Sequence, residues 1–180
     1  MEITGEYQIG ASREAVWQAL NDPEVLKKCI PGCESLERIS DTEFAAAVVA
    51  AIGPVRATFN TALSLEDLKP PHSYRLVGES KATAGFGKGG ATVTLEENDA
   101  GTLLRYDADF RVGGKLAQVG SRLVLGVTRK TADDFFGAFS RELDSGAHRI
   151  DVGEQAAVPK TWIGIGAAIV VLLIWWFLLR

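Results

Sequence analysis

The stretch from Lys115 to Leu143 constrains the fold most, because it predicts one long amphipathic helix that needs an equally long apolar surface to cover. Its apolar residues recur three, four or eight positions apart and share one stripe of a helix roughly eight turns long: Leu116, Val119, Leu123, Val127, Phe135, Phe139 and Leu143. Gly120 and Gly126 lie inside this helix, although each costs about 1 kcal/mol relative to alanine. They leave room either for something bound beneath the helix or for close packing of a neighbouring strand.

Two short helices and seven strands are predicted ahead of the long helix. Residues 3–9 alternate between apolar and polar side chains and form the first strand. Ser12 caps a helix over residues 13–20, and Asp22 followed by Pro23 begins a second helix that runs to Cys29. Six further strands are expected over residues 35–39, 43–52, 55–65, 74–78, 91–95 and 104–112.

This order of elements predicts an α+β domain over residues 1–144. Short turns between successive strands require antiparallel pairing, and the long C-terminal helix is the element large enough to cover the apolar face of the sheet. A curved antiparallel sheet of about seven strands around one helix tends to leave a cavity, and apolar cavities hold apolar ligands.

The predicted cavity is lined by the inward row of the strand over residues 55–65 and by residues opposite it. Thr61 and Tyr106 are the polar groups expected to meet the carbonyl of a bound ligand. The full set of expected ligand contacts is Phe59, Thr61, Leu63, Leu76, Phe86, Val93, Tyr106, Leu116, Val119 and Leu123.

The glycine-rich stretch from Gly85 to Gly90 contains the letters of a dinucleotide-binding loop. That motif needs a helix after it, whereas a strand pattern follows here. We therefore expect a flexible hairpin at the mouth of the cavity with Phe86 as a gate, or a plain glycine-rich turn.

The C-terminal tail predicts a membrane anchor. Trp162 to Leu179 is an uncharged run, flanked by Lys160 and Arg180, and as a helix it would extend about 27 Å, close to the ~30 Å hydrocarbon core of a bilayer. Residues 145–161 are expected to be a flexible linker. The N-terminus does not have the pattern of a signal peptide. These features predict a single-pass anchor at residues 162–179 in the cytoplasmic membrane, with the N-terminal domain in the cytoplasm.

Composition and motifs exclude several classes of function. The formal net charge of −4 and the absence of a basic run argue against nucleic-acid binding. Cys29 and Cys33 lack the further ligands of a zinc site and are expected to be reduced thiols. No nucleophile motif with a histidine base is present, so an enzyme is not expected.

Lys115, Arg122 and Arg129 share one helical face, which is either solvated or turned toward phospholipid or an acidic partner.

The order of elements resembles the START-like, helix-grip superfamily of lipophilic-ligand domains. Three stretches resemble the family of the carbon monoxide dehydrogenase G-subunit more specifically: MEITGEYQIGASREAVWQALNDPEVLKKCIPGCESLE, AGFGKGGATVTL and VGGKLAQVGSRLV. The resemblance implies an accessory protein of the aerobic molybdenum-containing CO dehydrogenase, or of a related molybdenum hydroxylase. It implies recruitment of that enzyme to the membrane and transfer of its electrons to an isoprenoid quinone, either menaquinone or ubiquinone.

Three functions remain open from the sequence. The first is a tethered quinone carrier that has no covalently bound cofactor, because the quinone itself carries the redox chemistry. The second is a recruitment subunit whose interior is only a packed core, and the third is an enzyme of the START-like type. A carrier of a lipophile unrelated to the dehydrogenase is a further alternative.

Overall fold

The computed structural model describes residues 1–147 and gives side chains as far as Asp144. The elements follow the order β1 (Glu2–Ile9), α1 (Arg13–Ala19), α2 (Pro23–Cys29), β2 (Cys33–Arg38), β3 (Glu43–Ile52), β4 (Val55–Lys69), β5 (Ser73–Ala82), β6 (Gly85–Asn98), β7 (Gly101–Gly114), α3 (Lys115–Val119) and α4 (Ser121–Ala147). The predicted α+β class and the seven strands are confirmed.

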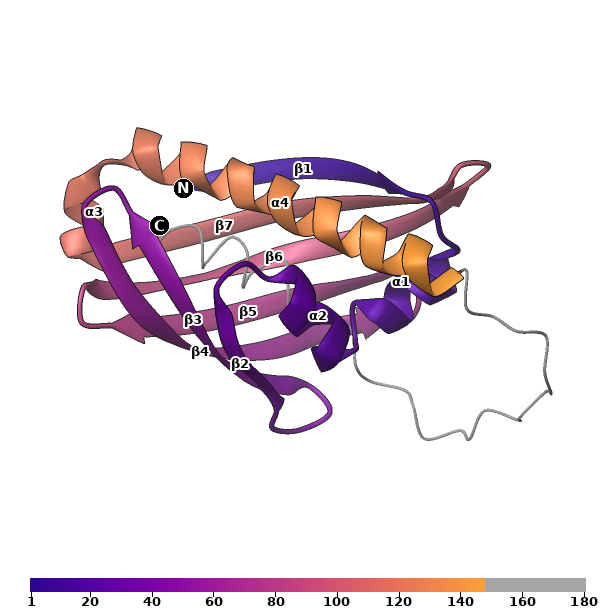
Figure 1. The fold of residues 1–180 in the computed structure, drawn as a ribbon, viewed down its shortest axis with the longest axis horizontal. Coiled ribbons are helices and arrows are strands. Elements are labelled where there is room, and N and C mark those ends of the chain that lie inside the picture. Colours follow the sequence, from indigo (N-terminus) through magenta and orange to yellow (C-terminus); the bar gives the residue numbers. More distant parts are fainter. Residues whose placement is uncertain (148–180) are drawn as a thin grey trace.

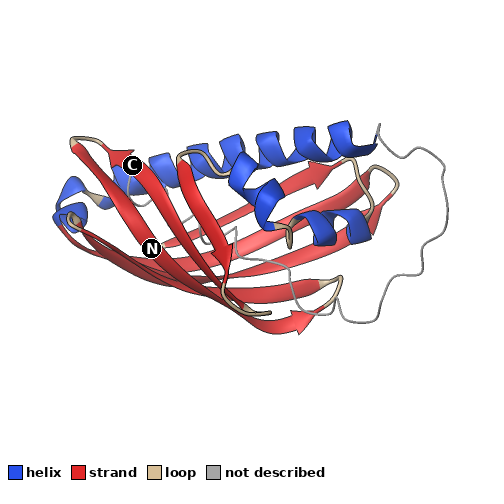
Figure 2. Ribbon diagram, turned by 60° about the horizontal axis from the view of Figure 1, so that its bottom comes forward, coloured by secondary structure: helices blue, strands red, loops and turns tan. Residues whose placement is uncertain are grey.

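The strands form one antiparallel sheet in the order β1-β7-β6-β5-β4-β3-β2. Each strand pairs with its neighbour in sequence, except that β1 pairs with β7 at the far edge. The sheet curves around α4, and all the helices lie on the same side of it (Figures 1 and 2). We call the face that α4 covers the inner face and the opposite face the outer face.

The two short helices begin where the sequence predicts. The Ser12 side chain accepts a hydrogen bond from the Ala15 amide at 3.3 Å, and the Asp22 carboxylate accepts one from the Glu24 amide at 2.9 Å. Both caps satisfy amides that have no partner within their own helix. The caps therefore define the residues at which α1 and α2 begin.

The prediction of one continuous long helix is wrong, because the chain breaks at Gly120. This residue has φ +99° and ψ 136°, a backbone conformation that residues other than glycine rarely adopt. The break changes which residues of α4 point inward, since the helical phase restarts at Ser121. Val124 is buried in place of Leu123, which is 43% exposed.

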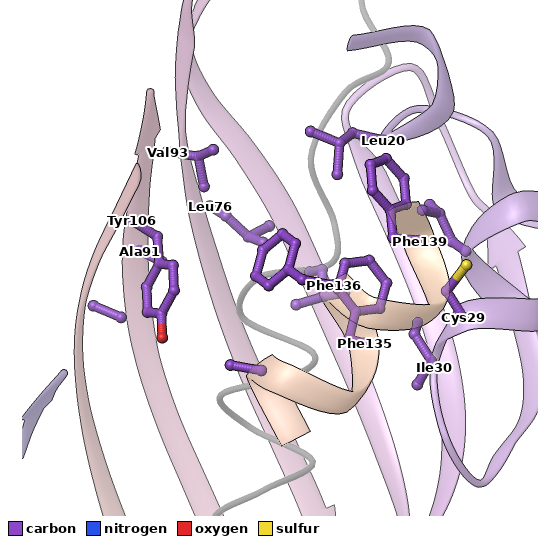
Figure 3. Close-up of a cluster of buried hydrophobic side chains, with 14 of the residues drawn as sticks. Leu20, Cys29, Ile30, Leu76, Ala91, Val93, Tyr106, Phe135, Phe136 and Phe139 are labelled. Carbon is purple, nitrogen blue, oxygen red and sulfur yellow. The ribbon is translucent and has the colours of Figure 1, made fainter. Parts of the chain in front are cut away.

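The densest part of the core lies under the C-terminal half of α4. Phe135, Phe136 and Phe139 are each at most 1% exposed, and their rings pack against one another (Figure 3). The ring of Phe136 also stacks on Tyr7 of β1 with 4.1 Å between ring centroids. The edge strand and the helix are thus held together by aromatic packing.

The glycine-rich stretch is part of strand β6 and not a flexible loop. Residues 85–90 pair on one side with β5 and on the other with β7, as in the register Gly85 to Ala82 and Gly85 to Gly114. A methyl carbon placed on Gly85 would lie 2.1 Å from the carbonyl oxygen of Gly113, so the two strands approach too closely for a side chain there. The turn itself consists of Thr83 and Ala84.

No helix within the described part of the chain is long and apolar enough to cross a bilayer. The predicted membrane segment at residues 162–179 and most of the predicted linker lie outside the described residues. The first three residues of that linker, 145–147, belong to α4.

Candidate ligand-binding interior

Seven of the ten residues expected to contact a ligand meet on the inner face. Each is at most 6% exposed, and they come from β4, β5, β6, β7 and α3: Phe59, Thr61, Leu63, Leu76, Val93, Tyr106 and Leu116. Figure 3 shows Leu76, Val93 and Tyr106 on neighbouring strands facing the Phe136 ring of α4. The alternation predicted for the long strand therefore places its inward row correctly.

A row of small and polar residues crosses the inner face beside Thr61. The sheet register pairs Thr61 with Ser80 of β5, Ser80 with Gly87 of β6, and Gly87 with Val112 of β7. Ser80 is fully buried, and its hydroxyl has no hydrogen-bond partner. Ser80 was not among the predicted contacts, although it lies four positions after Leu76 and so shares its face.

Two more buried hydroxyls lie around the same interior without a partner. These are Thr131 on α4 and Tyr74 on β5, both at most 1% exposed. By contrast, the neighbouring Thr128 donates a hydrogen bond to the Val124 carbonyl at 3.0 Å. A buried polar group without a partner costs roughly 1–3 kcal/mol, so these hydroxyls are available to hydrogen-bond a polar atom that reaches them.

The ring of Tyr106 lies on the inner face between Gly5 and two aromatic neighbours, Tyr7 and Phe136. Its ring covers Gly5 so closely that a methyl carbon there would lie 2.6 Å away, and it stacks on Phe136 with 6.2 Å between centroids. Burial raises the pKa of Tyr106, and burial followed by the hydrogen bond to Asp133 raises the pKa of Tyr7. Both phenols are therefore protonated at neutral pH and are able to donate hydrogen bonds.

The other three predicted contacts are not buried, and of these Val119 packs against the edge of the core. Phe86 points to the outer face, is 45% exposed and covers Gly113 with its ring. Its position follows from strand parity, since Phe86 is five residues before the inward Ala91. Val119 is half-buried and Leu123 is exposed, and both lie against the β3–β4 turn at Gly53.

Two pockets in the described part of the chain open on the outer surface and not between α4 and the sheet. The larger, about 630 Å³, lies at the β5–β6 turn and is lined by Glu79, Lys81, Ala82, Thr83, Ala84, Gly85, Phe86, Gly114 and Lys115. The smaller, about 440 Å³, lies over β1, β6 and β7 and is lined by Thr4, Gly5, Glu6, Thr92, Thr94, Arg105, Tyr106 and Asp107.

Within residues 1–147, no cluster of three or more histidine, cysteine, aspartate or glutamate side chains is arranged to hold a metal. Cys29 and Cys33 are free thiols. Burial raises the pKa of Cys29 to about 11, which leaves it almost entirely protonated and weakly nucleophilic at neutral pH.

Several solved structures share this fold. A conserved protein from Geobacillus kaustophilus is 32% identical with a TM-score of 0.77, and the match covers 81% of this chain and 97% of that one. The protein TTHA0849 from Thermus thermophilus is 16% identical with a TM-score of 0.63, over 82% and 99% of the two chains. The Zhui aromatase/cyclase from Streptomyces sp. R1128 is 14% identical with a TM-score of 0.61, over 86% and 99%. The last two similarities, at such low identity, concern the fold alone.

No curated protein sequence matches this chain significantly. The match to a family is extensive, since residues 5–144 align with the family described as the G-subunit of carbon monoxide dehydrogenase (CoxG). That alignment runs from the first strand to the last residue of α4 with a described side chain, and therefore includes every element around the interior. The chain belongs to the CoxG family of carbon monoxide dehydrogenase G-subunits.

Proposed function

We propose that this protein is a membrane-anchored accessory protein of the aerobic molybdenum-containing CO dehydrogenase that binds an isoprenoid quinone beneath α4. It recruits the dehydrogenase to the cytoplasmic face of the membrane and passes its electrons to the respiratory chain. Family membership supports the partner. The observation that supports quinone as the ligand is a set of buried hydroxyls without hydrogen-bond partners in a mainly apolar interior.

A quinone matches this interior chemically. Its isoprenoid tail is apolar and suits Phe59, Leu63, Leu76 and Val93, while its two carbonyl oxygens accept hydrogen bonds. Ser80 and Thr131 supply hydroxyl donors that have no other partner, and Thr61 and Tyr106 are further donors that we assign to the site. The protein residues bind and orient the quinone, and the quinone supplies the redox chemistry.

Entry of a long lipophile requires a part of the domain that moves, and we assign this role to the helix around the break at Gly120. On its two sides, Val119 and Leu123 both lie against the β3–β4 turn at Gly53, and neither is fully buried. The part of the helix around this break is far from the phenylalanine cluster that secures the other half of α4. We assign the gap between Val119, Leu123 and the β3–β4 turn as the entrance.

The membrane attachment rests on the sequence of residues 162–179, an uncharged run long enough to span a bilayer. A quinone is too apolar to leave lipid unaided, whereas the dehydrogenase partner is soluble. A lipophile-binding domain attached to the bilayer by its own chain joins these two compartments. The protein needs no catalytic residues for this role, and we propose that it is not an enzyme.

Quinone binding is tested by removing the buried hydroxyls that have no hydrogen-bond partner, which we call the orphan hydroxyls. Ser80→Ala and Thr131→Val should each weaken the binding of menaquinone or ubiquinone about tenfold, the equivalent of ~1.4 kcal/mol. Each should also leave the ligand-free protein as stable as before or more stable, because an unsatisfied group is removed. Thr58→Val on the exposed side of β4 is the control and should change neither quantity. Unchanged quinone affinity in both variants would refute this site.

Pure recruitment is a second candidate, favoured by the fact that the two pockets described above lie outside the interior. Deleting the gene should abolish CO-driven oxygen consumption by membranes while sparing dehydrogenase activity toward a soluble dye. Full rescue by Phe59→Trp, which fills the interior, would favour recruitment alone, whereas quinone transfer predicts failed rescue. Unchanged CO-dependent respiration in the deletion strain would argue for a lipid carrier unconnected to the dehydrogenase.

A further inference from the structure

One end of the domain carries a basic surface that the interior site does not use. Lys81, Lys88 and Arg111 lie on the outer face of β5, β6 and β7, and Lys115 begins α3 beside them; we call these four residues the basic tip. The Lys115 amide donates a hydrogen bond to the Ala84 carbonyl at 3.0 Å, which fixes α3 against the β5–β6 turn. Figure 1 shows α3 and this turn at the opposite end of the domain from α1.

The positive charge of the basic tip is largely uncompensated. Lys88 lies between Glu79 of β5 and Arg111 of β7 in the sheet register, so one carboxylate faces the four cations of the basic tip. Lys81 forms an ion pair with Glu79 at 3.4 Å, but its side chain remains 75% exposed. Among the ion pairs of the described residues, none includes Lys88, Arg111 or Lys115.

An exposed aromatic ring lies among these cations. Phe86 is the cross-strand partner of Lys81 and is 45% exposed. Together with Lys81 and Lys115 it lines the pocket of about 630 Å³ at the β5–β6 turn, where Glu79 is the acidic lining residue. Ammonium groups around an apolar ring are the combination that binds the boundary between phosphate headgroups and acyl chains.

The opposite end of the domain lacks such an excess of positive charge. Glu96, Glu97 and Asp99 are exposed at the β6–β7 turn, and Glu14 is exposed on α1 nearby. Arg105 pairs with Glu96, and Arg13 pairs with Glu14 and Glu97, so these four carboxylates face two cations. An anionic surface would therefore attract the basic tip more strongly than this end. An uneven distribution of charge such as this one both attracts the domain to an anionic surface and orients it there.

We propose that the basic tip docks on the surface of an anionic phospholipid bilayer, with Phe86 at the level of the headgroups and the adjacent pocket around a lipid phosphate. This inference rests on the proposed membrane attachment and adds to it the face that meets the lipid. It brings α3 and the Gly120 break, where we place the entrance, to the surface from which a quinone would be loaded. The exposed ring favours lipid over an acidic protein as the occupant.

The test uses the full chain reconstituted in vesicles, with an environment-sensitive fluorophore on a single cysteine in a Cys29→Ala/Cys33→Ser background. Thr83→Cys reports on the basic tip, and Ala100→Cys reports on the acidic end as the control position. On vesicles rich in phosphatidylglycerol, the emission of the probe at 83 should shift to shorter wavelength and return at high salt. The probe at 100 should not shift, and vesicles of phosphatidylcholine alone should give little shift at either position.

Charge substitutions complete the test. Lys81→Gln/Lys88→Gln/Arg111→Gln should lower the ratio of docked to undocked protein on the order of 100-fold, given the typical contribution of each basic residue near an anionic surface. Lys27→Gln/Lys69→Gln/Arg141→Gln removes the same net charge elsewhere and should leave the ratio within about twofold.

Two outcomes would overturn docking: the probe at 83 behaves alike on neutral and anionic vesicles, or both triple variants lose the shift equally. A probe that stays in water on anionic vesicles yet responds to purified dehydrogenase would also overturn it and assign the basic tip to an acidic protein. Flotation of the chain with neutral vesicles measures the anchor separately. Failure of the anchor is thereby distinguished from failure of the basic tip.

Discussion

The hydroxyl of Tyr7 donates a hydrogen bond to the carboxylate of Asp133 over 2.7 Å, and this bond joins edge strand β1 to the middle of α4. The ring of the same tyrosine stacks on Phe136. The contact closes the sheet and its covering helix on the side away from β2. The bond therefore stabilises the edge of the interior that lies between β1 and α4.

We expect Tyr7→Phe to lower the free energy of unfolding by about 1 kcal/mol, since it removes one hydrogen bond and retains the ring. Tyr74→Phe is the matched change, because it also deletes one phenolic hydroxyl, but that hydroxyl has no partner. It should be neutral or stabilising. Urea denaturation followed by circular dichroism measures both, and equal losses in the two variants would contradict the assignment of the Tyr7 bond.

Stability should fall at alkaline pH. Burial raises the pKa of Tyr74 above its ordinary value near 10, so above pH 10 the unfolded chain loses a proton that the folded chain retains. The unfolded state then binds fewer protons, and the free energy of unfolding decreases by up to about 1.4 kcal/mol per pH unit for one such tyrosine. Thermal melts between pH 8 and about pH 11 should show a shallower decline for Tyr74→Phe. An identical decline in both proteins would rule out this contribution.

Two glycines of the helical region should respond oppositely to alanine. Gly126 lies within α4, where an added methyl meets nothing within 4 Å, so Gly126→Ala should stabilise by about 0.5–1 kcal/mol. Gly120 has equally open surroundings but φ +99°, so Gly120→Ala should destabilise by roughly 1–3 kcal/mol. Melting temperatures measured side by side test both signs. Stabilisation by Gly120→Ala would indicate a continuous helix.

A chain ending at Ala147 should fold on its own and remain soluble without detergent. Among the described residues, the buried apolar cluster includes side chains from every element between β1 and α4, so we expect its packing to persist without the tail. Near- and far-ultraviolet circular dichroism would detect a native core in the truncated chain. Loss of the near-ultraviolet signal would mean that the tail belongs to the fold and is not an anchor.

The sheet could be predicted from the sequence because strand periodicity is local. Alternation along β4 placed Phe59, Thr61 and Leu63 on the inner face, and the structure confirms each as buried. The same parity would have placed Phe86 on the outer face if residues 85–90 had been taken as strand. Four glycines in those six positions concealed it, since glycine has no side chain to show alternation.

The long helix could be predicted only in part, because its phase depends on one backbone angle. Leu116 and Phe135 are buried as expected, but the positive φ of Gly120 moves Leu123 outward and Val124 inward. Composition does not reveal whether a glycine within a helical pattern continues the helix or interrupts it. The orphan hydroxyls were missed for a different reason, since hydrogen-bond satisfaction depends on packing and not on the order of residues.

The direction of α4 sets a limit on how the domain can approach a bilayer. The helix has 27 residues and is about 40 Å long, and its last residue lies near α1, at the end opposite the basic tip. Residues 148–161 can span at most about 48 Å, so the basic tip can meet the bilayer with the domain upright only if this segment is almost fully stretched. Deleting residues 151–157 would halve that reach to about 24 Å and leave only orientations in which the domain lies flat. With the proposed anchor at residues 162–179, the length of this segment therefore limits which docked orientations are possible, and the charge of the lipid acts within that limit.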